Sequence, residues 1–356
     1  MQNFLGQDGF IWFVGVVEDR QDPQHLGRVR VRCLGYHTAD KNALPTSDLP
    51  WASPVLPITS SGISGIGQTP LGLVEGSWVF GFFRDSSYAQ EPMILGSLPG
   101  RPTEEASEGG FYDPNKIFPR HTDEPDTNRL AVNNEDNPHL GLELRKATRI
   151  TGLATADFDA DTAADASTIT ASDTDNWDQP EIAYASQYPS NHVYESESGH
   201  ILEFDDTSAA ERIHLAHKTG TSLEYNPNGD RVQIIKGIDY KLTSSHNLVN
   251  IEGRSDISIG GRHKIYINKD GAENNNYDIQ VGPNANVNIQ VDTGDINLVT
   301  KQGKVNVNSG GDYNVKVGGN YTMTVAGNRN ITTDGTTTDN TTGSVTHRGS
   351  TIDLNP

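Results

Sequence analysis

The sequence predicts an all-β protein in three parts, and three observations support this prediction. The first hundred residues contain short apolar or alternating runs separated by glycine and proline turns. The middle of the chain is rich in aspartate, alanine and threonine and poor in large apolar residues. In the last third, glycine recurs at every eighth position. We therefore expect a barrel, an irregular acidic linker and a repetitive β-structure, in that order.

The composition of the 356-residue chain excludes several classes of protein. A formal net charge of −20 argues against binding of nucleic acid or an anionic membrane by bulk electrostatics, so we expect no nucleic-acid partner. The single cysteine, Cys33, excludes an intrachain disulfide framework and a cysteine-based zinc cluster. There is no run of 18 apolar residues that would predict a membrane span, and the first ten residues lack the pattern of a signal peptide.

Five short runs in residues 1–100 predict strands. Their number, their length and the glycine-containing turns between them favour a small OB-type barrel. The runs are Phe10–Glu18, Gly27–Leu34, Trp51–Ile58, Ser77–Phe83 and Pro92–Leu98.

The second of these runs alternates strictly between apolar and basic residues. One face carries Val29, Val31 and Cys33, and the other carries Arg28, Arg30 and Arg32. The apolar face is predicted to be core, which makes Cys33 a packing residue and not a nucleophile. For the arginine face three interpretations remain: a salt-bridged strand face, an interface with another protein, or a nucleic-acid surface. The first is favoured because acidic residues lie just upstream, at Glu18, Asp19 and Asp22.

The acidity of the chain is concentrated in its middle third. Residues 101–200 contain seven basic and twenty acidic residues, a net charge of −13. Within them, Ala154–Asp178 consists almost entirely of Ala, Asp, Thr and Ser, a composition that buries too little apolar surface to offset the entropy of ordering. We interpret residues 101–185 as a linker with two short ordered patches, Phe111–Pro119 and Leu140–Arg149.

The last third carries an eight-residue repeat. Six glycines follow one another at this spacing, with apolar residues at alternate positions between them. An earlier run, from Val249 to Ile267, has the same period in a phase shifted by two residues. The repeat glycines are Gly303, Gly311, Gly319, Gly327, Gly335 and Gly343.

An octad is too short to enclose a core within one chain. It provides a strand of about five residues and a turn, whereas a single-chain solenoid needs about 20 residues or more per coil. Three chains that contribute one octad each provide about 24, so the repeat predicts an intertwined trimeric β-helix, with left-handed glycines (φ > 0) at its corners. The inward core candidates are Val305, Val307, Val315, Val317, Tyr321, Met323, Val325 and Ile331.

The histidines provide little evidence of a metal or catalytic site. His214 and His217 lie in a strand-like segment and are expected at the surface or in an interface. His347, near the end of the repeat, is the one low-ranking candidate for a metal ligand at the tip of a trimer. We predict no catalytic residues, no metal site and no cofactor. A secreted adhesin or fibre stalk is an alternative interpretation of the repeat by itself.

Several long segments resemble a known family. Trp12–His37 (WFVGVVEDRQDPQHLGRVRVRCLGYH) is similar to the N-terminal OB domain of the central spike, or tail-lysozyme, proteins of T-even-like contractile-tailed bacteriophages, which are related to the VgrG spike of type VI secretion. Further similar segments are Leu49–Gly67, Val74–Phe83, Tyr112–Arg120, Glu195–Thr207 and Glu211–Thr221. The octad repeat corresponds to the trimeric β-helix of that family.

This resemblance implies a structural role in a phage tail. A homotrimer would dock on the baseplate hub at the end of the tail tube and pierce the host outer membrane when the sheath contracts. A separate tip-sharpening protein is a further expected partner, and the arginines Arg28, Arg30 and Arg32 are the expected hub interface. The location would be the tail baseplate of the virion, assembled in the host cytoplasm.

The resemblance also divides the chain. Residues 1–100 would be the hub-docking OB domain, 101–185 the linker, 186–244 a β-rich neck and 245–356 the octad β-helix. In the family a helical lysozyme domain lies between the OB domain and the spike, but here only about 64 residues occupy that place. A glycosidase needs two carboxylates held across a sugar, one of them in an apolar pocket, and the linker offers no such pocket. We therefore predict that the chain is not an enzyme. A cell-wall hydrolase and an OB-fold ligand-binding fibre remain the alternative functions.

Overall fold

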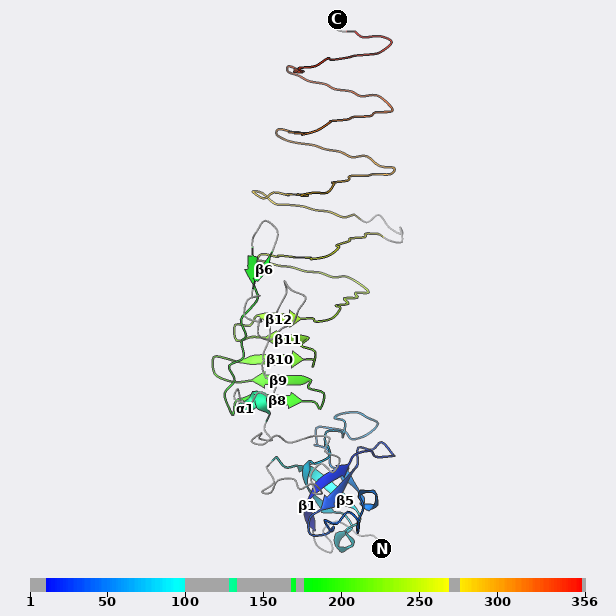
Figure 1. Ribbon diagram of the computed structural model, residues 1–356, viewed down its shortest axis with the longest axis vertical. Helices are drawn as coiled ribbons and strands as arrows, with labels where there is room; N and C mark the ends of the chain where they lie inside the picture. The colour runs from blue at the N-terminus through cyan, green and yellow to red at the C-terminus, as the bar shows by residue number, and fades with distance from the viewer. Residues whose placement is uncertain (1–10, 100–127, 133–167, 171–175, 269–275, 354–356) are drawn as a thin grey trace. The chain divides into compact units, whose positions relative to one another are not determined.

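The computed structural model describes residues 11–99, 128–132, 168–170, 176–268 and 276–353 (Figure 1). The chain divides into two units, residues 1–264 and 265–356. The predicted all-β class is confirmed: in the described residues, strands alternate with loops, and helical structure is limited to short turns such as α1 (Arg129–Val132). None of the described helices is long and apolar enough to cross a membrane. The expected patches at Phe111–Pro119 and Leu140–Arg149 lie outside the described residues.

Five strands form a closed barrel in the first hundred residues. Their order around the barrel is β1-β2-β3-β5-β4, in which β3 and β5 are parallel and every other pair is antiparallel. Each strand falls within one residue of its predicted run or inside it, so the sequence interpretation of this region is confirmed. The strands are β1 (Trp12–Asp19), β2 (Val29–Cys33), β3 (Trp51–Pro54), β4 (Trp78–Phe83) and β5 (Pro92–Ser97).

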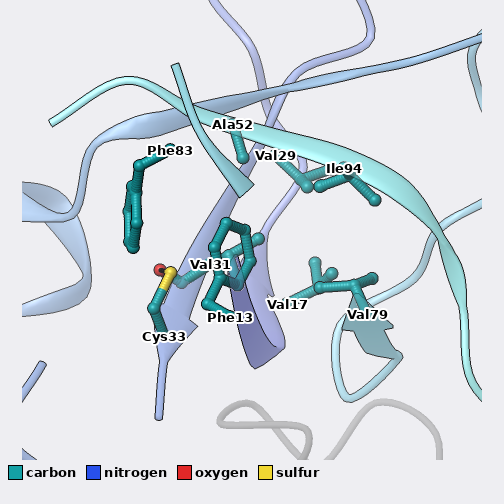
Figure 2. Close-up of a cluster of buried hydrophobic side chains, with 9 residues drawn as sticks. All are labelled: Phe13, Val17, Val29, Val31, Cys33, Ala52, Val79, Phe83 and Ile94. Atoms are coloured by element: carbon teal, nitrogen blue, oxygen red, sulfur yellow. Dashed lines mark hydrogen bonds between the residues drawn. The ribbon is translucent and has the colours of Figure 1, made fainter. Parts of the chain in front are cut away.

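The barrel is filled by one apolar cluster that draws on every strand (Figure 2). The predicted inward residues of β2 are among its members, and Cys33 is fully buried. Burial raises the pKa of the Cys33 thiol to about 12, so the side chain is an apolar packing group at neutral pH. The cluster comprises Phe13, Val17, Val29, Val31, Cys33, Ala52, Val79, Phe83 and Ile94.

Gly81 allows β4 to pass close to both of its neighbours. A Cβ atom at this position would lie 2.0 Å from the carbonyl oxygen of Met93 on β5 and 2.8 Å from the ring of Phe13 on β1. Glycine in a strand is expected where another backbone approaches this closely. The small residue therefore sets how tightly the barrel closes.

A second sheet, of five strands, is formed by residues 191–234. Its strands are antiparallel throughout and neighbours in sequence are neighbours in space, as the stacked green arrows of Figure 1 show. Three of its four hairpin loops contain a glycine with positive φ: Gly199, Gly220 and Gly229. The strands are β8 (Asn191–Glu195), β9 (Ile201–Asp205), β10 (Arg212–Ala216), β11 (Ser222–Tyr225) and β12 (Arg231–Ile234). A separate two-stranded hairpin joins β6 (Thr168–Thr170) and β7 (Asn176–Asp178).

One face of this five-stranded sheet buries an ion network. Glu203 of β9, His214 of β10 and Glu224 of β11 lie directly opposite one another on adjacent strands. Arg212 reaches both carboxylates, at 2.6 Å from Glu203 and 2.9 Å from Glu224, and the His214 Nδ1 atom lies 3.2 Å from Glu203. All four side chains are buried. The expectation that His214 lies at the surface or in an interface is wrong, because its strand neighbours on both sides are carboxylates that hold it inward.

Segments that precede the sheet in sequence cover this buried face. The Tyr184 ring lies under the Arg212 guanidinium, with its centroid 5.0 Å from the guanidinium carbon, and the Tyr184 hydroxyl donates to the Leu130 carbonyl of α1. The amide of Asn191 donates to the same carbonyl at 3.1 Å and to Glu203 at 2.6 Å. Leu130 and Ile201 form a small apolar cluster beside the network. Burial and the nearby Glu203 charge raise the pKa of Tyr184, which keeps its hydroxyl a hydrogen-bond donor.

Residues 235–353 differ from both sheets. In the described part of this segment no strand is assigned, and the side chains are exposed from Lys236 onward. Figure 1 shows the yellow-to-red trace running back and forth in extended segments that do not lie against one another. One chain alone therefore provides no backbone ladder here.

Replacing Gly81 with alanine is predicted to destabilise the barrel by about 3 kcal/mol, because the added methyl group forces backbone apart between β4 and β5. The measurement is thermal unfolding followed by tryptophan fluorescence, since three of the four tryptophans lie in the barrel region. Gly96→Ala on β5 is the matched control, because a Cβ atom there meets nothing within 4 Å. Equal midpoints for the two variants would contradict the argument.

The second prediction concerns acid. Burial alone would raise the pKa of Glu203, but hydrogen bonds from His214 and Asn191 and the charge of Arg212 outweigh it and hold the pKa below its ordinary value of 4.5. A carboxylate whose folded pKa is depressed contributes stability above its unfolded pKa and loses it as the pH falls through the folded value. We expect Glu203→Gln to lower the free energy of unfolding by about 3 kcal/mol at pH 7. Between pH 5 and pH 3 the free energy of unfolding of this variant should fall by less than that of the wild type, because the variant has no carboxylate to protonate at this position.

Thermal unfolding followed by circular dichroism across this pH range measures the effect. Glu211→Gln is the control, since Glu211 is an exposed carboxylate next to Arg212 in sequence. Stability profiles for wild type and Glu203→Gln that run parallel below pH 5 would show that Glu203 does not contribute in this way.

Candidate assembly surface

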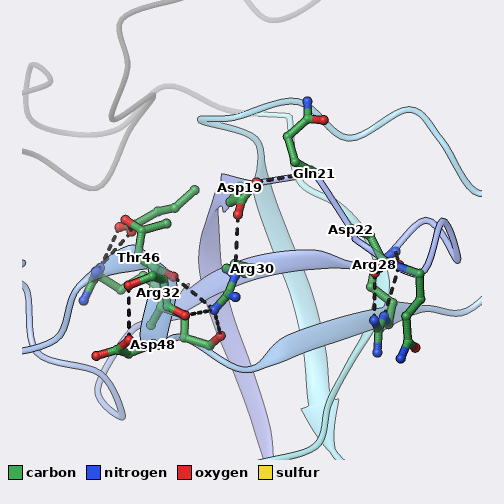
Figure 3. A network of polar contacts seen from close by, with 12 residues as sticks. Asp19, Gln21, Asp22, Arg28, Arg30, Arg32, Thr46 and Asp48 are labelled. Atoms are coloured by element: carbon green, nitrogen blue, oxygen red, sulfur yellow. Dashed lines mark hydrogen bonds and ion pairs between the residues drawn. The ribbon is translucent and has the colours of Figure 1, made fainter.

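Each arginine of the predicted stripe on β2 is paired within the chain (Figure 3). Arg28 contacts Asp22 at 2.7 Å, Arg30 contacts Asp19 at 3.5 Å and Arg32 contacts Glu18 at 2.6 Å. These are the three upstream carboxylates that the sequence offers as partners, so the salt-bridged interpretation of this strand face is confirmed. An additional role of these arginines as a hub interface stays a prediction.

Arg32 is an internal anchor, because both it and Glu18 are fully buried. Its guanidinium also donates to the carbonyls of Thr38 at 2.7 Å and Leu44 at 2.9 Å, and the Thr46 hydroxyl donates to Glu18 at 2.6 Å. Burial by itself would raise the pKa of Glu18, but the hydrogen bonds from Arg32 and Thr46 outweigh it and lower the pKa below 4.5. The network holds the segment that follows β2 against the barrel.

The other two arginines are partly exposed, and they order the loop before β2 and the segment before β3. The Arg28 side chain and the backbone N–H groups of Gln24 and Leu26 donate to Asp22, which holds the pKa of Asp22 far below its ordinary value of 3.8. Arg30 donates to the carbonyls of Ser47 and Leu49. Its guanidinium also lies over the Trp51 ring, 4.4 Å from the centroid. The guanidinium groups of Arg28, Arg30 and Arg32 therefore form most of their hydrogen bonds within the domain.

The outward face of the five-stranded sheet is largely apolar from β8 to β11, the reverse of what is usual for a sheet in water, and carries Arg231 and Gln233 on β12. We call it the outer face. Opposite pairs on adjacent strands form one row from Tyr194 through Leu202 and Leu215 to Leu223, and a second row from Phe204 through Ile213 to Tyr225. Between 39% and 68% of the surface is exposed for six of these residues: Tyr194, Leu202, Phe204, Ile213, Leu215 and Tyr225.

An exposed apolar patch that spans four neighbouring strands is typical of an interaction surface, because burying apolar side chains away from water is favourable. The polar face of the same sheet is already covered by α1 and the Tyr184 segment. The outer face is therefore the side of the sheet that remains available for association.

The same pattern continues through the octads. The eight predicted core residues, Val305 to Ile331, lie at alternate positions and have 46% to 67% of their surface exposed in this single chain. The run after β12 begins in the same way, with Ile238, Tyr240 and Leu242 all exposed at every second position. Whether these side chains point toward a threefold axis stays a prediction.

The expectation of left-handed corners at the octad glycines is wrong. None of the glycines from Gly303 to Gly343 in the repeat has a φ in the left-handed range, in contrast to Gly199, Gly220 and Gly229 in the sheet hairpins. The chain changes direction at the octad glycines by a bend rather than a tight hydrogen-bonded turn, and such a bend does not need positive φ. A Cβ atom at Gly311, Gly319, Gly327 or Gly335 would meet nothing within 4 Å in one chain.

His347 is exposed near the end of the repeat. In the described part of one chain, no group of three or more His, Cys, Asp or Glu side chains is arranged to hold a metal ion.

Comparison with known proteins agrees with these features. The profile of the Gp5 N-terminal OB domain matches residues 35–187, and that of the Gp5 C-terminal repeat matches residues 311–334 in three copies. Three copies in this range make each copy one octad long, beginning at Gly311. The matched OB range begins after β2 and extends past the last strand of the barrel.

Two relatives are similar over different lengths. Protein Gp5 of Vibrio phage KVP40 is 39% identical over 293 residues, which cover 74% of this chain and 66% of that protein. The pre-baseplate central spike protein Gp5 of Enterobacteria phage T4 is 45% identical over 130 residues, which cover 35% of this chain and 22% of that protein. The chain thus spans just under two-thirds of the first relative and less of the second. The chain thus contains members of two Gp5 domain families, the N-terminal OB domain and the C-terminal repeat.

Proposed function

We propose that three copies of this chain form the central spike of a contractile tail baseplate. The observation that carries the proposal is the row of exposed apolar side chains at alternate positions in a segment whose described residues make no strand pairing within one chain. Such a row needs partner strands on both sides, and chains of the same sequence provide them. The name of the T4 relative, a pre-baseplate central spike protein, supports the same role.

The trimer follows from the length of the repeat. Three octads supply about 24 residues per turn, enough to enclose a narrow core, whereas one octad cannot. Backbone N–H and C=O groups of each octad are then satisfied by neighbouring chains, and closing the ladder around the axis removes exposed sheet edges.

Each part of the chain has a place in this assembly. Residues 1–100 dock on the baseplate hub at the end of the tail tube, and residues 101–185 connect them to a neck of residues 186–244. Residues 245–356 form the needle, to which a tip-sharpening protein is added in the virion. Sheath contraction drives the needle through the host outer membrane. A closed, intertwined β-structure suits this task because bending or separating it requires many ladder hydrogen bonds to break together.

The role is mechanical and not enzymatic. The two matched profiles are an OB domain and a repeat, and neither describes a lysozyme domain. Two of the buried carboxylates of the described sheets, Glu18 and Glu203, are engaged by arginine and have lowered pKa values. A glycosidase acid needs the opposite, a raised pKa in an open cleft.

Sedimentation of the purified full-length chain tests the trimer. We expect a species of three times the chain mass that persists in SDS without boiling and dissociates only on heating. A chain that sediments as a monomer at micromolar concentration would overturn the proposal.

A peptidoglycan zymogram tests the absence of hydrolase activity. The trimer is expected to produce no clearing, with a phage lysozyme run beside it as the positive control. Clearing at the position of this chain would contradict the proposal and assign the chain a hydrolase activity.

A further inference from the structure

The five-stranded sheet and the octad repeat differ in how much of their backbone hydrogen bonding one chain provides by itself. In the five-stranded sheet, four antiparallel ladders join strands of the same chain. In the described residues beyond β12, no such ladder is present. The sheet can therefore fold before chains meet, because its contacts are local in sequence, whereas the octads must wait for their partners.

Once folded, the sheet presents a defined apolar surface. The ion network of Arg212, Glu203 and Glu224 and the contacts of Tyr184 and Leu130 hold one face inward. The outer face is left exposed, with Phe204, Ile213 and Leu215 near its centre. A folded surface loses less conformational entropy on association than an unpaired strand does, so it is the better site for a first encounter.

The octads are poorly suited to choose their own alignment. Because glycine and the apolar positions recur every eight residues from Gly303 to Gly343, sliding one chain by one octad against another keeps the pattern in phase. The two rows of the outer face do not repeat: Tyr194, Leu202, Leu215 and Leu223 form one, and Phe204, Ile213 and Tyr225 the other. Contact through these rows specifies a single alignment.

We propose that the outer face of the β8–β12 sheet is the nucleus on which three copies of this chain first associate. Its occupant is the same face of the other two copies. On β12 this face carries Arg231 and Gln233, and exposed apolar residues at every second position resume after the strand, at Ile238, Tyr240 and Leu242. Tethering three chains at the sheet raises the effective concentration of their octads, which then close in order toward the C-terminus. This inference rests on the proposed trimer.

Refolding kinetics of matched variants test the nucleus. Full-length chain is unfolded in denaturant and diluted, and the appearance of SDS-resistant trimer is followed with time. Ile213→Ala on the outer face is expected to slow trimer formation at least tenfold. Ile331→Ala, the same change in an octad, is expected to alter that rate less than twofold while speeding dissociation of the finished trimer.

Equal slowing by the two variants, or greater slowing by Ile331→Ala, would overturn the nucleus and leave the trimer standing. Failure of the wild type to form any trimer would overturn the proposed function itself, and with it the nucleus.

Pulsed hydrogen exchange on the wild type provides a second measurement that does not depend on a variant that folds. Backbone amides of residues 201–225 are expected to gain protection before those of residues 303–349, and before trimer appears. Protection that appears in the octads first would overturn the proposed order of assembly.

Discussion

Backbone hydrogen bonding is the constraint on which the whole architecture depends. Every residue of a buried strand needs a partner for its N–H and C=O groups, and the three parts of the chain meet this need in different ways. The barrel closes on itself, since β1 pairs with both β2 and β4. In the five-stranded sheet, β9, β10 and β11 pair with a neighbouring strand on both sides, whereas β8 and β12 are edge strands. The described octads find no ladder within one chain. Backbone pairing within the described chain therefore decreases from the N-terminus to the C-terminus.

The barrel and the five-stranded sheet, whose strands pair within one chain, each contain a buried arginine. Arg32 in the barrel and Arg212 in the sheet are both fully buried against glutamates. Such pairs add little net stability relative to apolar residues of the same volume, but any misalignment leaves a charge buried without its partner, which is costly. We infer that these two networks contribute specificity of register. The octads carry no comparable network in the described chain, and their alignment must come from elsewhere.

Sequence patterns predicted the strands better than they predicted the roles of individual residues. The alternation in β2 located Val29, Val31 and Cys33 in the core and paired the arginines with their upstream carboxylates. It did not show that Arg32 is fully buried, because a basic residue at an alternate position reads as solvent-facing unless its partners in the loop are known. Period-two patterns also failed to locate His214, since alternation defines two faces of a strand but not which one is covered. The spacing of the glycines revealed the octads but not the φ angle at each glycine. That angle depends on how tightly the chain turns there, and the octads turn by open bends.

The five-stranded sheet shows why such a face cannot be assigned from one chain's pattern alone. In the segment from Ile201 to Asp205, apolar and acidic residues alternate, and the usual rule would bury Leu202 and Phe204 and expose Glu203. The structure does the reverse, because Arg212 and His214 neutralise Glu203 and because Tyr184 and Leu130 cover it. In the proposed trimer the usual rule would hold again, because Leu202 and Phe204 would become core residues of the assembly. The reversed hydrophobic pattern of this strand is therefore an observation that supports the proposed trimer.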